Sequence, residues 1–223
     1  MAQARKANWF AIWISIGVVV ALVLVTVLVV WMNNTATAPG PRPDGSGINE
    51  ETGAITVGAG DDELDVWFDF YCSHCQAFED SYGPTIDDLL EEGRITLNLL
   101  PVALPGLNAA SGTDFSERSA SAMYCVAQDE PDAVYPFFQA VFAERPNGAG
   151  LTDDELVAHA NDAGATGAAS CIEDHEFVDF VNTQTGKIPE SPTGGAGTPT
   201  IILNGEYVTL TGDPEADLVA PLG

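Results

Sequence analysis

Residues 65–80, DVWFDFYCSHCQAFED, decide how the rest of the chain is interpreted. Dense apolar and aromatic residues over 63–71 predict a buried central strand, which leads directly into Cys72 and Cys75. After the cysteines, apolar residues recur at roughly helical spacing up to Glu92, so a helix is expected there. Two cysteines with two residues between them form a redox couple, half of a metal site or a small structural disulfide.

The expected helix start gives Cys72 a distinctive chemistry. Unpaired backbone N–H groups and the helix dipole favour an anion at a helix N-terminus, so a thiol placed there has a lowered pKa. His74, when protonated, adds a positive charge beside the sulfur. Both effects stabilise the reduced thiolate and make the disulfide a stronger oxidant. We expect a substrate thiolate to attack Cys72, while Cys75, one turn into the helix, is the buried resolving cysteine.

The other two interpretations of the cysteine pair are weaker. A structural zinc site needs four ligands, usually two such pairs, and the sequence has no second CxxC. The remaining histidines, His159 and His175, read as ordinary helix-surface residues. A structural disulfide across so short a loop restricts the unfolded chain little. We therefore expect no metal site and no cofactor besides the redox-active disulfide.

The N-terminal segment predicts the compartment. Arg5 and Lys6 precede an uncharged run from Phe10 to Val30, which as a helix of ~1.5 Å per residue spans about 30 Å, the thickness of a bilayer core. We expect an uncleaved single-pass anchor in the cell membrane, with a cytoplasmic N-terminus and an extracytoplasmic catalytic domain. The alternative is a signal peptide cleaved after Ala36-Thr37-Ala38, but the run is longer than a usual signal core.

Charge and cysteine content narrow the function classes further. The chain has 33 acidic and 7 basic residues and a formal net charge of −26, which repels phosphate backbones, so we expect no nucleic-acid partner. An even number of cysteines in an exported domain indicates disulfides. Four cysteines allow three pairings, and taking Cys72 with Cys75 as the local couple leaves Cys125 with Cys171.

The order of patterns predicts an α/β sheet domain interrupted by helices. Residues 1–32 are a cytoplasmic tip and transmembrane anchor, and residues 33–52, rich in Asn, Thr, Gly and Pro, are a flexible linker. Residues 53–104 and 187–223 carry the strands. Residues 105–186 carry almost no strand signal and form a helical insertion.

Individual elements follow from the same patterns. Strands are expected at 53–58, 63–71, 94–104, 197–203 and 206–210, the last two joined by an Asn204-Gly205 turn, and helices at 73–92, 115–128, 133–144, 152–163, 168–185 and 214–220. The strand at 94–104 is expected parallel to the first because a helix lies between them. Gly83-Pro84 should kink or divide the first helix, Asp132 is a candidate cap, and Thr152 with Glu155 forms a capping box.

The run Phe68 to Cys75, entering a helix, together with Gly197-Thr198-Pro199 before a later strand, resembles thioredoxin-fold proteins. The helical block between them resembles the DsbA type. The anchor and the second cysteine pair are similar to membrane-tethered thiol–disulfide oxidoreductases of actinobacteria. The resemblance covers roughly residues 53–220. It implies a thioredoxin-like α/β fold with an inserted α-helical subdomain, preceded by one N-terminal transmembrane helix.

The same resemblance assigns roles to residues far from the motif. It implies a cis peptide bond before Pro199, which would lie beside the two cysteines, and a substrate peptide paired with the backbone of Thr198. It also implies a structural bridge between Cys125 and Cys171 in the helical insertion, which stabilises the fold by up to ~4 kcal/mol in the chain-entropy model.

Two positions depart from the family pattern. Family members often have Pro where Ser73 stands, and this residue tunes the redox potential, so the direction of electron flow stays open. Thioredoxins also carry a buried acid six residues before the first cysteine, where this chain has Val66. Asp69 is a candidate proton relay in its place, and an exposed or capped carboxylate is the other interpretation.

These inferences predict a membrane-tethered protein-disulfide oxidoreductase that introduces disulfides into exported cysteine-containing proteins. A membrane reoxidase of the VKOR or DsbB type would restore its disulfide. The rival within the enzyme class is a disulfide reductase or isomerase of the same fold. A non-enzymatic copper-binding module using Cys72, His74 and Cys75 is the rival from another class, and a catalytically silent thioredoxin-like anchor is the third.

Overall fold

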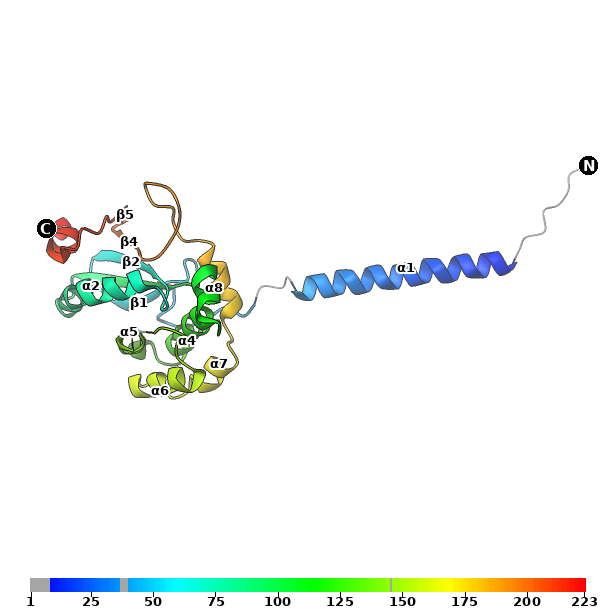
Figure 1. The fold of residues 1–223 in the computed structure, drawn as a ribbon, viewed down its shortest axis with the longest axis horizontal. Helices are drawn as coiled ribbons and strands as arrows, with labels where there is room; N and C mark the ends of the chain where they lie inside the picture. Colours follow the sequence, from blue (N-terminus) through cyan, green and yellow to red (C-terminus); the bar gives the residue numbers. More distant parts are fainter. Residues whose placement is uncertain (1–8, 37–39, 145) are drawn as a thin grey trace, which may run out of the picture. The chain divides into compact units, whose positions relative to one another are not determined.

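The computed structural model describes residues 9–36, 40–144 and 146–223 (Figure 1). The chain forms two units, Met1–Pro39 and Gly40–Gly223. All strands found among the described residues, and all four cysteines, belong to the second unit.

The first unit contains one helix, α1 (Trp9–Ala36), which includes the whole of the predicted apolar run. Counting the residues whose side chains the structure describes, no helix is long and apolar enough to cross a membrane. The predictions for Arg5 and Lys6, and for residues 37–39 at the cleavage motif, lie outside the described residues. The membrane anchor therefore stays a prediction from the sequence.

The second unit is built on a mixed five-stranded sheet with the strand order β1-β3-β2-β4-β5. The strands are β1 (Ile55–Gly58), β2 (Asp62–Phe68), β3 (Ile95–Pro101), β4 (Thr200–Leu203) and β5 (Glu206–Tyr207). β2 pairs with β3 in parallel, as predicted, and the other pairs are antiparallel. The central position of β2 explains why its last three residues are all buried.

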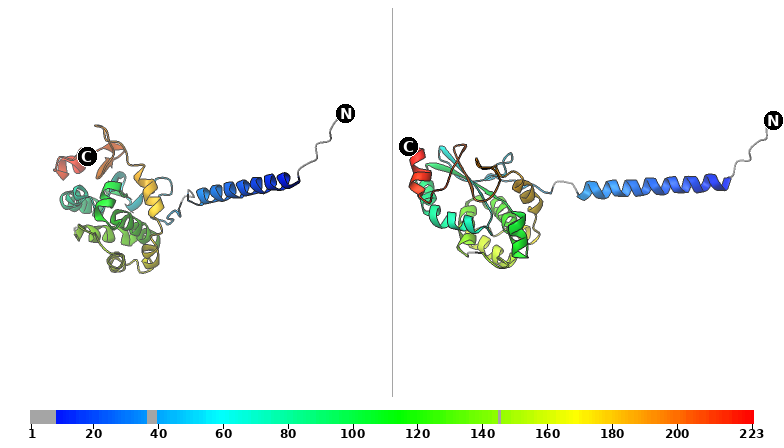
Figure 2. Two further views of the ribbon diagram at one scale, coloured as in Figure 1. Left: turned by 45° about the vertical axis from the view of Figure 1, so that its right-hand side comes forward. Right: turned by 45° about the horizontal axis from the view of Figure 1, so that its top comes forward.

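Helix α2 (Ser73–Glu91) connects the two parallel strands. The helical insertion follows with α3 (Pro105–Ser111), α4 (Phe115–Asp129), α5 (Val134–Ala143), α6 (Asp153–Ala163), α7 (Ala169–Glu173) and α8 (Val178–Thr185). Short turns of helix lie at Pro131–Ala133 and, after the last strand, at Glu215–Val219 and Ala220–Leu222. In both views of Figure 2 the green-to-yellow helices lie across the unit from the red C-terminal segment.

An aromatic cluster joins the end of β2 to the insertion. Phe68 lies edge-to-face against Phe70 and against Phe138 of α5, with ring centroids 5.0 and 4.9 Å apart. Phe70 and Phe142 are also 5.0 Å apart. Such pairs stabilise a core beyond simple area burial, so the point where β2 leads into the cysteines is held rigidly.

The second unit begins earlier than the predicted domain start at residue 53. Ile48 forms a bridge with Ile55 and is only 7% exposed, and the Thr56 N–H donates to the Gly47 carbonyl at 2.8 Å. Burial of one apolar side chain thus orders residues 40–52, which the composition had suggested were a flexible linker.

Helix α2 continues through Pro84, where a kink or division was expected. A buried stripe that includes Phe78, Tyr82, Ile86 and Leu89 runs along its whole length. Because these side chains pack on the sheet before and after the proline, tertiary contacts hold both halves in one helix despite the missing backbone hydrogen bond.

Two further differences concern the insertion. The predicted helix over 168–185 is interrupted after α7, where His175 adopts the left-handed conformation with φ of 52°. Helix α3 has no counterpart among the predicted helical windows, although Pro105 at its first position is a recognised helix-start signal.

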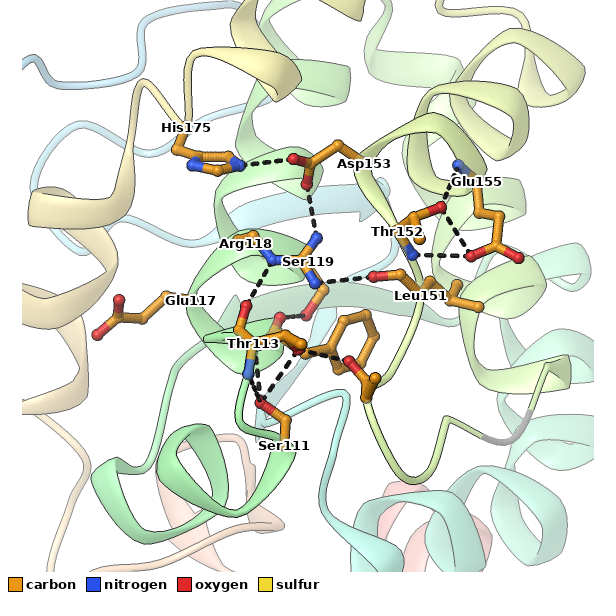
Figure 3. Close-up of polar contacts among 12 residues, drawn as sticks. Ser111, Thr113, Glu117, Arg118, Ser119, Leu151, Thr152, Asp153, Glu155 and His175 are labelled. Atoms are coloured by element: carbon orange, nitrogen blue, oxygen red, sulfur yellow. Dashed lines mark hydrogen bonds and ion pairs between the residues drawn. The ribbon is translucent and has the colours of Figure 1, made fainter.

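Helix starts were predicted correctly in one case and incorrectly in another. Thr152 and Glu155 form the expected capping box, with the Thr152 N–H donating to Glu155 Oε2 at 2.8 Å (Figure 3). The prediction of Asp132 as a cap is wrong, because the short turn before α5 makes Ala133 the N-cap residue.

Cys125 of α4 and Cys171 of α7 form a disulfide, with Cα atoms 5.7 Å apart. Their separation of 46 residues makes this a long cross-link, and Cys125 is buried in the insertion. The bridge therefore restricts the unfolded chain far more than a disulfide between Cys72 and Cys75 would.

We predict that the double variant Cys125→Ala/Cys171→Ala loses up to about 4 kcal/mol of unfolding free energy, because the open chain gains loop entropy. Denaturant unfolding of the purified protein measures this loss. The variant Cys72→Ala/Cys75→Ala is the control and should change stability less. An equal effect of the two double variants would contradict the structural role of the long bridge.

Candidate active site

The end of β2 and the start of α2 place Cys72 at the predicted helix N-terminus. Cys72 is the N-cap residue, with an extended backbone (φ −79°, ψ 117°), and Ser73 is the first helical residue. The Cys72 N–H donates to the Asp69 carbonyl at 3.0 Å, which closes a tight turn after the strand. The backbone N–H groups of the first helical turn are therefore available to the Cys72 sulfur.

The two cysteines of the motif differ in burial. Both are free thiols in this structure, with Cys72 6% exposed and Cys75 1% exposed. Cys75 lies on the same buried stripe of α2 as Phe78 and Tyr82. Of the two sulfurs, Cys72 is thus the one closer to solvent.

Their environments also separate their pKa values. The pKa of Cys72 is lowered from 9.0 to about 5, although burial opposes this. The Cys75 thiol contributes most to stabilising the Cys72 thiolate, and smaller contributions come from the Thr198 side chain and the backbone N–H groups of Cys75 and His74. Burial, together with the neighbouring Cys72 charge, raises the pKa of Cys75. The reduced pair therefore consists of a Cys72 thiolate and a Cys75 thiol near neutral pH.

The side chain of His74 is exposed, while its backbone N–H is one of the groups that lower the pKa of Cys72. The electrostatic role expected of its imidazole stays a prediction. The other two histidines lie in the insertion, where His159 approaches Glu144 at 3.7 Å and His175 approaches Asp153 at 2.9 Å.

Thr198 and Pro199 lie beside Cys72, as the resemblance implied. The Thr198–Pro199 peptide bond is cis, and the Thr198 carbonyl oxygen is 3.5 Å from Cys72 Sγ across 126 residues of sequence. The Thr198 hydroxyl is buried and has no hydrogen-bond partner within the described residues, and the Thr198 side chain lowers the pKa of both cysteines. This hydroxyl is thus a second stabiliser of the thiolate, and the sequence pattern did not single it out.

Asp69 is fully buried, so it is not an exposed carboxylate, but its backbone hydrogen bonds agree with the interpretation as a capped one. Its two oxygens accept from the N–H groups of Tyr71 and Leu104, both at 2.9 Å, and burial raises its pKa to about 6. Val66, at the position of the family acid, is 1% exposed among the apolar residues of the core.

A largely apolar groove of about 590 Å³ is lined by His74, which lies between the cysteines in sequence, and by Thr198, which contacts Cys72. Its lining comes from α2, from the loop before β4 and from the segment around β5, and includes His74, Phe78, Tyr82, Pro199, Ile201 and Leu210. Asp217 fixes the position of Tyr82 in this lining, since its carboxylate accepts hydrogen bonds from Tyr82 Oη at 2.5 Å and from the Thr211 N–H at 2.7 Å. Sequence reasoning missed this groove because three separate segments form it.

A polar network centred on Arg118 lies in the insertion (Figure 3). Arg118 donates to Asp153 Oδ1 at 2.6 Å and to the Leu151 carbonyl at 2.8 Å, and thereby holds the segment that precedes α6. The carbonyl of Gly148 in this segment accepts from Tyr71 Oη at 2.7 Å. Tyr71, the residue before Cys72, is thus tied to the insertion by contacts that the sequence did not reveal.

Comparison with known proteins agrees with this architecture. A family model described as thioredoxin matches residues 52–217, which is more than half of the chain. The chain belongs to the thioredoxin family. Among curated proteins, none matches the sequence.

Solved structures of thiol–disulfide oxidoreductases resemble the chain. Oxidised DsbA from Mycobacterium tuberculosis is 26% identical with a TM-score of 0.66, covering 76% of this chain and 90% of its own. DsbG from the same organism is 26% identical with a TM-score of 0.65, covering 76% and 85%. MdbA from Actinomyces oris, at 22% identity and a TM-score of 0.61, covers 83% and 95% and shows the shared fold. The predicted DsbA-like relationship and oxidoreductase class are confirmed.

We predict that the reduced protein shows thiolate absorbance in the ultraviolet with a titration midpoint near pH 5, the pKa of Cys72. The variant Thr198→Val keeps the side-chain shape but removes the hydroxyl, and should raise this midpoint by about one unit, the usual effect of one hydrogen bond to a charged group. Thr193→Val, on the exposed loop, is the matched control. An unchanged midpoint in Thr198→Val would refute the role of the hydroxyl.

The lowered pKa of Cys72 also predicts a pH-dependent stability. Because the unfolded thiol binds its proton up to about its ordinary pKa of 9.0, the folded thiolate adds stability that grows as pH rises from about 5 toward 9 and is lost as pH falls through about 5. In the oxidised protein neither cysteine titrates. Denaturant unfolding of both forms at several pH values should therefore show that the unfolding free energy of the reduced form increases relative to that of the oxidised form as pH rises. A difference that does not change with pH would contradict this.

Proposed function

We propose that the chain is an extracytoplasmic, membrane-tethered oxidase that passes the Cys72–Cys75 disulfide to exported proteins. The observation that carries the proposal is the contrast between the two sulfurs, a stabilised Cys72 thiolate beside a buried Cys75 thiol. Stabilising the reduced form makes the disulfide a stronger oxidant, because the thiolate released from Cys72 is a good leaving group.

The reaction follows from this asymmetry. A substrate thiolate attacks Cys72 Sγ, the bond to Cys75 breaks, and Cys75 leaves with the electron pair and takes up a proton. A second substrate thiolate then attacks the substrate sulfur of the mixed disulfide and releases Cys72 as a thiolate. Two electrons have moved to the enzyme, so a membrane reoxidase of the VKOR or DsbB type is needed to restore the disulfide.

The groove beside Cys72 suits an extended peptide. Its lining is mostly apolar and includes Thr198, whose backbone pairs with a substrate strand according to the family resemblance. A cysteine within an apolar, unfolded segment could therefore reach Cys72 while its flanks fill the groove. Newly exported proteins offer such segments before they fold.

Membrane attachment is part of the proposal. The uncharged run from Phe10 to Val30, preceded by Arg5 and Lys6, supports a single-pass anchor with the N-terminus in the cytoplasm. An extracytoplasmic position also suits a domain whose insertion is cross-linked by a disulfide.

The reductase or isomerase alternative uses the same cysteines but keeps them reduced. Ser73, between the cysteines, is exposed at the first position of α2, and nothing in its surroundings assigns the direction of electron flow. The copper-binding alternative would need metal bound after purification without chelator.

We predict that thiol trapping in growing cells finds most Cys72 and Cys75 oxidised, because an oxidase waits for substrate as a disulfide. The variant Cys75→Ser should accumulate mixed disulfides with exported proteins through Cys72, and Cys72→Ser, the matched control, should accumulate none. A pair found mainly reduced in the wild type would instead favour the reductase or isomerase.

A further inference from the structure

One wall of the groove beside Cys72 is a segment with little secondary structure of its own. Strand β5 has two residues, and after it one further backbone bond joins the Val208 N–H to the Ile201 carbonyl at 2.9 Å. Beyond that bond, Thr209, Leu210 and Gly212 line the groove at the outer edge of the sheet. A wall built in this way needs contacts from other elements to keep its position.

Tyr82 and Asp217 fasten this wall to helix α2. Tyr82 Oη donates to Asp217 Oδ2 at 2.5 Å and accepts from the Gly212 N–H at 2.8 Å. The Asp217 carboxylate also accepts from the N–H and from the hydroxyl of Thr211, at 2.7 and 2.8 Å. We call this set of hydrogen bonds the Tyr82–Asp217 clasp. It holds Thr211 and Gly212, and with them the wall, against the helix.

Both members of the clasp are fixed in the core. Tyr82 is 3% exposed and Asp217 is 8% exposed. The Tyr82 ring stacks on Phe78, with ring centroids 4.9 Å apart, and belongs to the same buried stripe of α2 as Cys75. Leu218, the neighbour of Asp217, is fully buried and anchors the C-terminal turn. Because hydrogen bonds to a carboxylate are charge-assisted, the clasp is stronger than a set of neutral bonds.

The wall also carries backbone groups that a substrate can use. The N–H and carbonyl groups of Thr209 and Leu210 form no hydrogen bond with other residues in the described part of the chain. An extended peptide can add to such an edge through main-chain bonds, while its side chains fill the apolar groove. Glutathione, a tripeptide without an apolar side chain, gains little from this wall.

We propose that the Tyr82–Asp217 clasp positions the peptide substrate, by holding the groove wall in the conformation that an extended cysteine-containing peptide needs. This inference rests on the proposed function. Because the wall is ordered before the peptide binds, binding does not include the entropy cost of ordering it. The clasp therefore favours cysteines within extended apolar segments over cysteines of small thiols, while other groups determine the chemistry of the two sulfurs.

The test compares two reductants of the Cys72–Cys75 disulfide in detergent-solubilised full-length protein. One is reduced glutathione, and the other is a synthetic peptide of Val, Leu and Thr residues around two cysteines. Thiol trapping at successive times measures both rates. Tyr82→Phe keeps the ring on Phe78 but removes the hydroxyl. It should raise the KM for the peptide and lower the ratio of the peptide rate to the glutathione rate about tenfold, the usual effect of losing a hydrogen bond to a charged group.

Tyr135→Phe is the matched control. It removes a tyrosine hydroxyl that donates to Asp87 at 2.7 Å, and neither residue lines the groove. This variant should leave the ratio unchanged. An equal fall of the ratio in Tyr82→Phe and Tyr135→Phe overturns the proposal. So does an equal loss of the peptide and glutathione rates in Tyr82→Phe, because that result indicates general loosening of the fold.

Two substitutions of Asp217 keep the test decisive if Tyr82→Phe folds poorly. Asp217→Asn retains a carbonyl oxygen for the Tyr82 hydroxyl and the Thr211 N–H, whereas Asp217→Leu removes every acceptor. The ratio should fall in Asp217→Leu and be largely kept in Asp217→Asn. The midpoint of Cys72 thiolate formation should stay near pH 5 in both. A wild-type ratio in Asp217→Leu overturns the proposal.

Failure of this inference and failure of the proposed function give different results. If the disulfide of the wild-type protein reacts with neither reductant, the redox function itself is wrong. If it reacts with both and the ratio is the same in the wild type and in all variants, only the role of the clasp is wrong.

Discussion

The antiparallel pairing of β4 with β2 is the constraint on which the rest of the site depends. Its register places Thr200 opposite Trp67, near the end of β2, so the residues just before β4 lie beyond that end. Because β2 leads into Cys72 there, the pairing brings Thr198 to 3.5 Å from a sulfur 126 residues away. The groove and the thiolate-stabilising hydroxyl both follow from this one alignment.

Local patterns predicted those parts of the site that single segments determine. A dense apolar strand that ends at a CxxC motif was enough to place Cys72 at a helix start. The Thr198-Pro199 sequence before a strand was enough, through the family resemblance, to predict that these two residues lie near the cysteines. The parts that depend on tertiary contacts were not predictable. The burial of Asp69 requires a backbone donor from the segment before α3, which is 35 residues away in sequence. The unbroken α2 requires packing on both sides of Pro84, and the order of residues 40–52 requires a place for Ile48 in the core.

The acidic composition gives the site an unusual electrostatic character. The chain has only 7 basic residues, and one of them, Arg118, forms an ion pair with Asp153 inside the insertion. Both groups at the site have neutral donors instead: the Cys75 thiol and backbone N–H groups at the start of α2 stabilise the Cys72 thiolate, and the N–H groups of Tyr71 and Leu104 donate to Asp69. Such dipoles are fixed by the fold and are screened less by salt than exposed ion pairs, which suits a protein whose own surface is strongly negative.

The disulfide between Cys125 and Cys171 has a consequence for the biogenesis of the protein. In the proposed extracytoplasmic location, a newly exported copy starts with reduced cysteines, and its insertion is not cross-linked until Cys125 and Cys171 are oxidised. With the proposed activity, a mature copy can oxidise Cys125 and Cys171 of a nascent copy, so each molecule is first a substrate of molecules made before it. Maturation would then be autocatalytic across a population of molecules, and the earliest copies would have to wait for an outside oxidant.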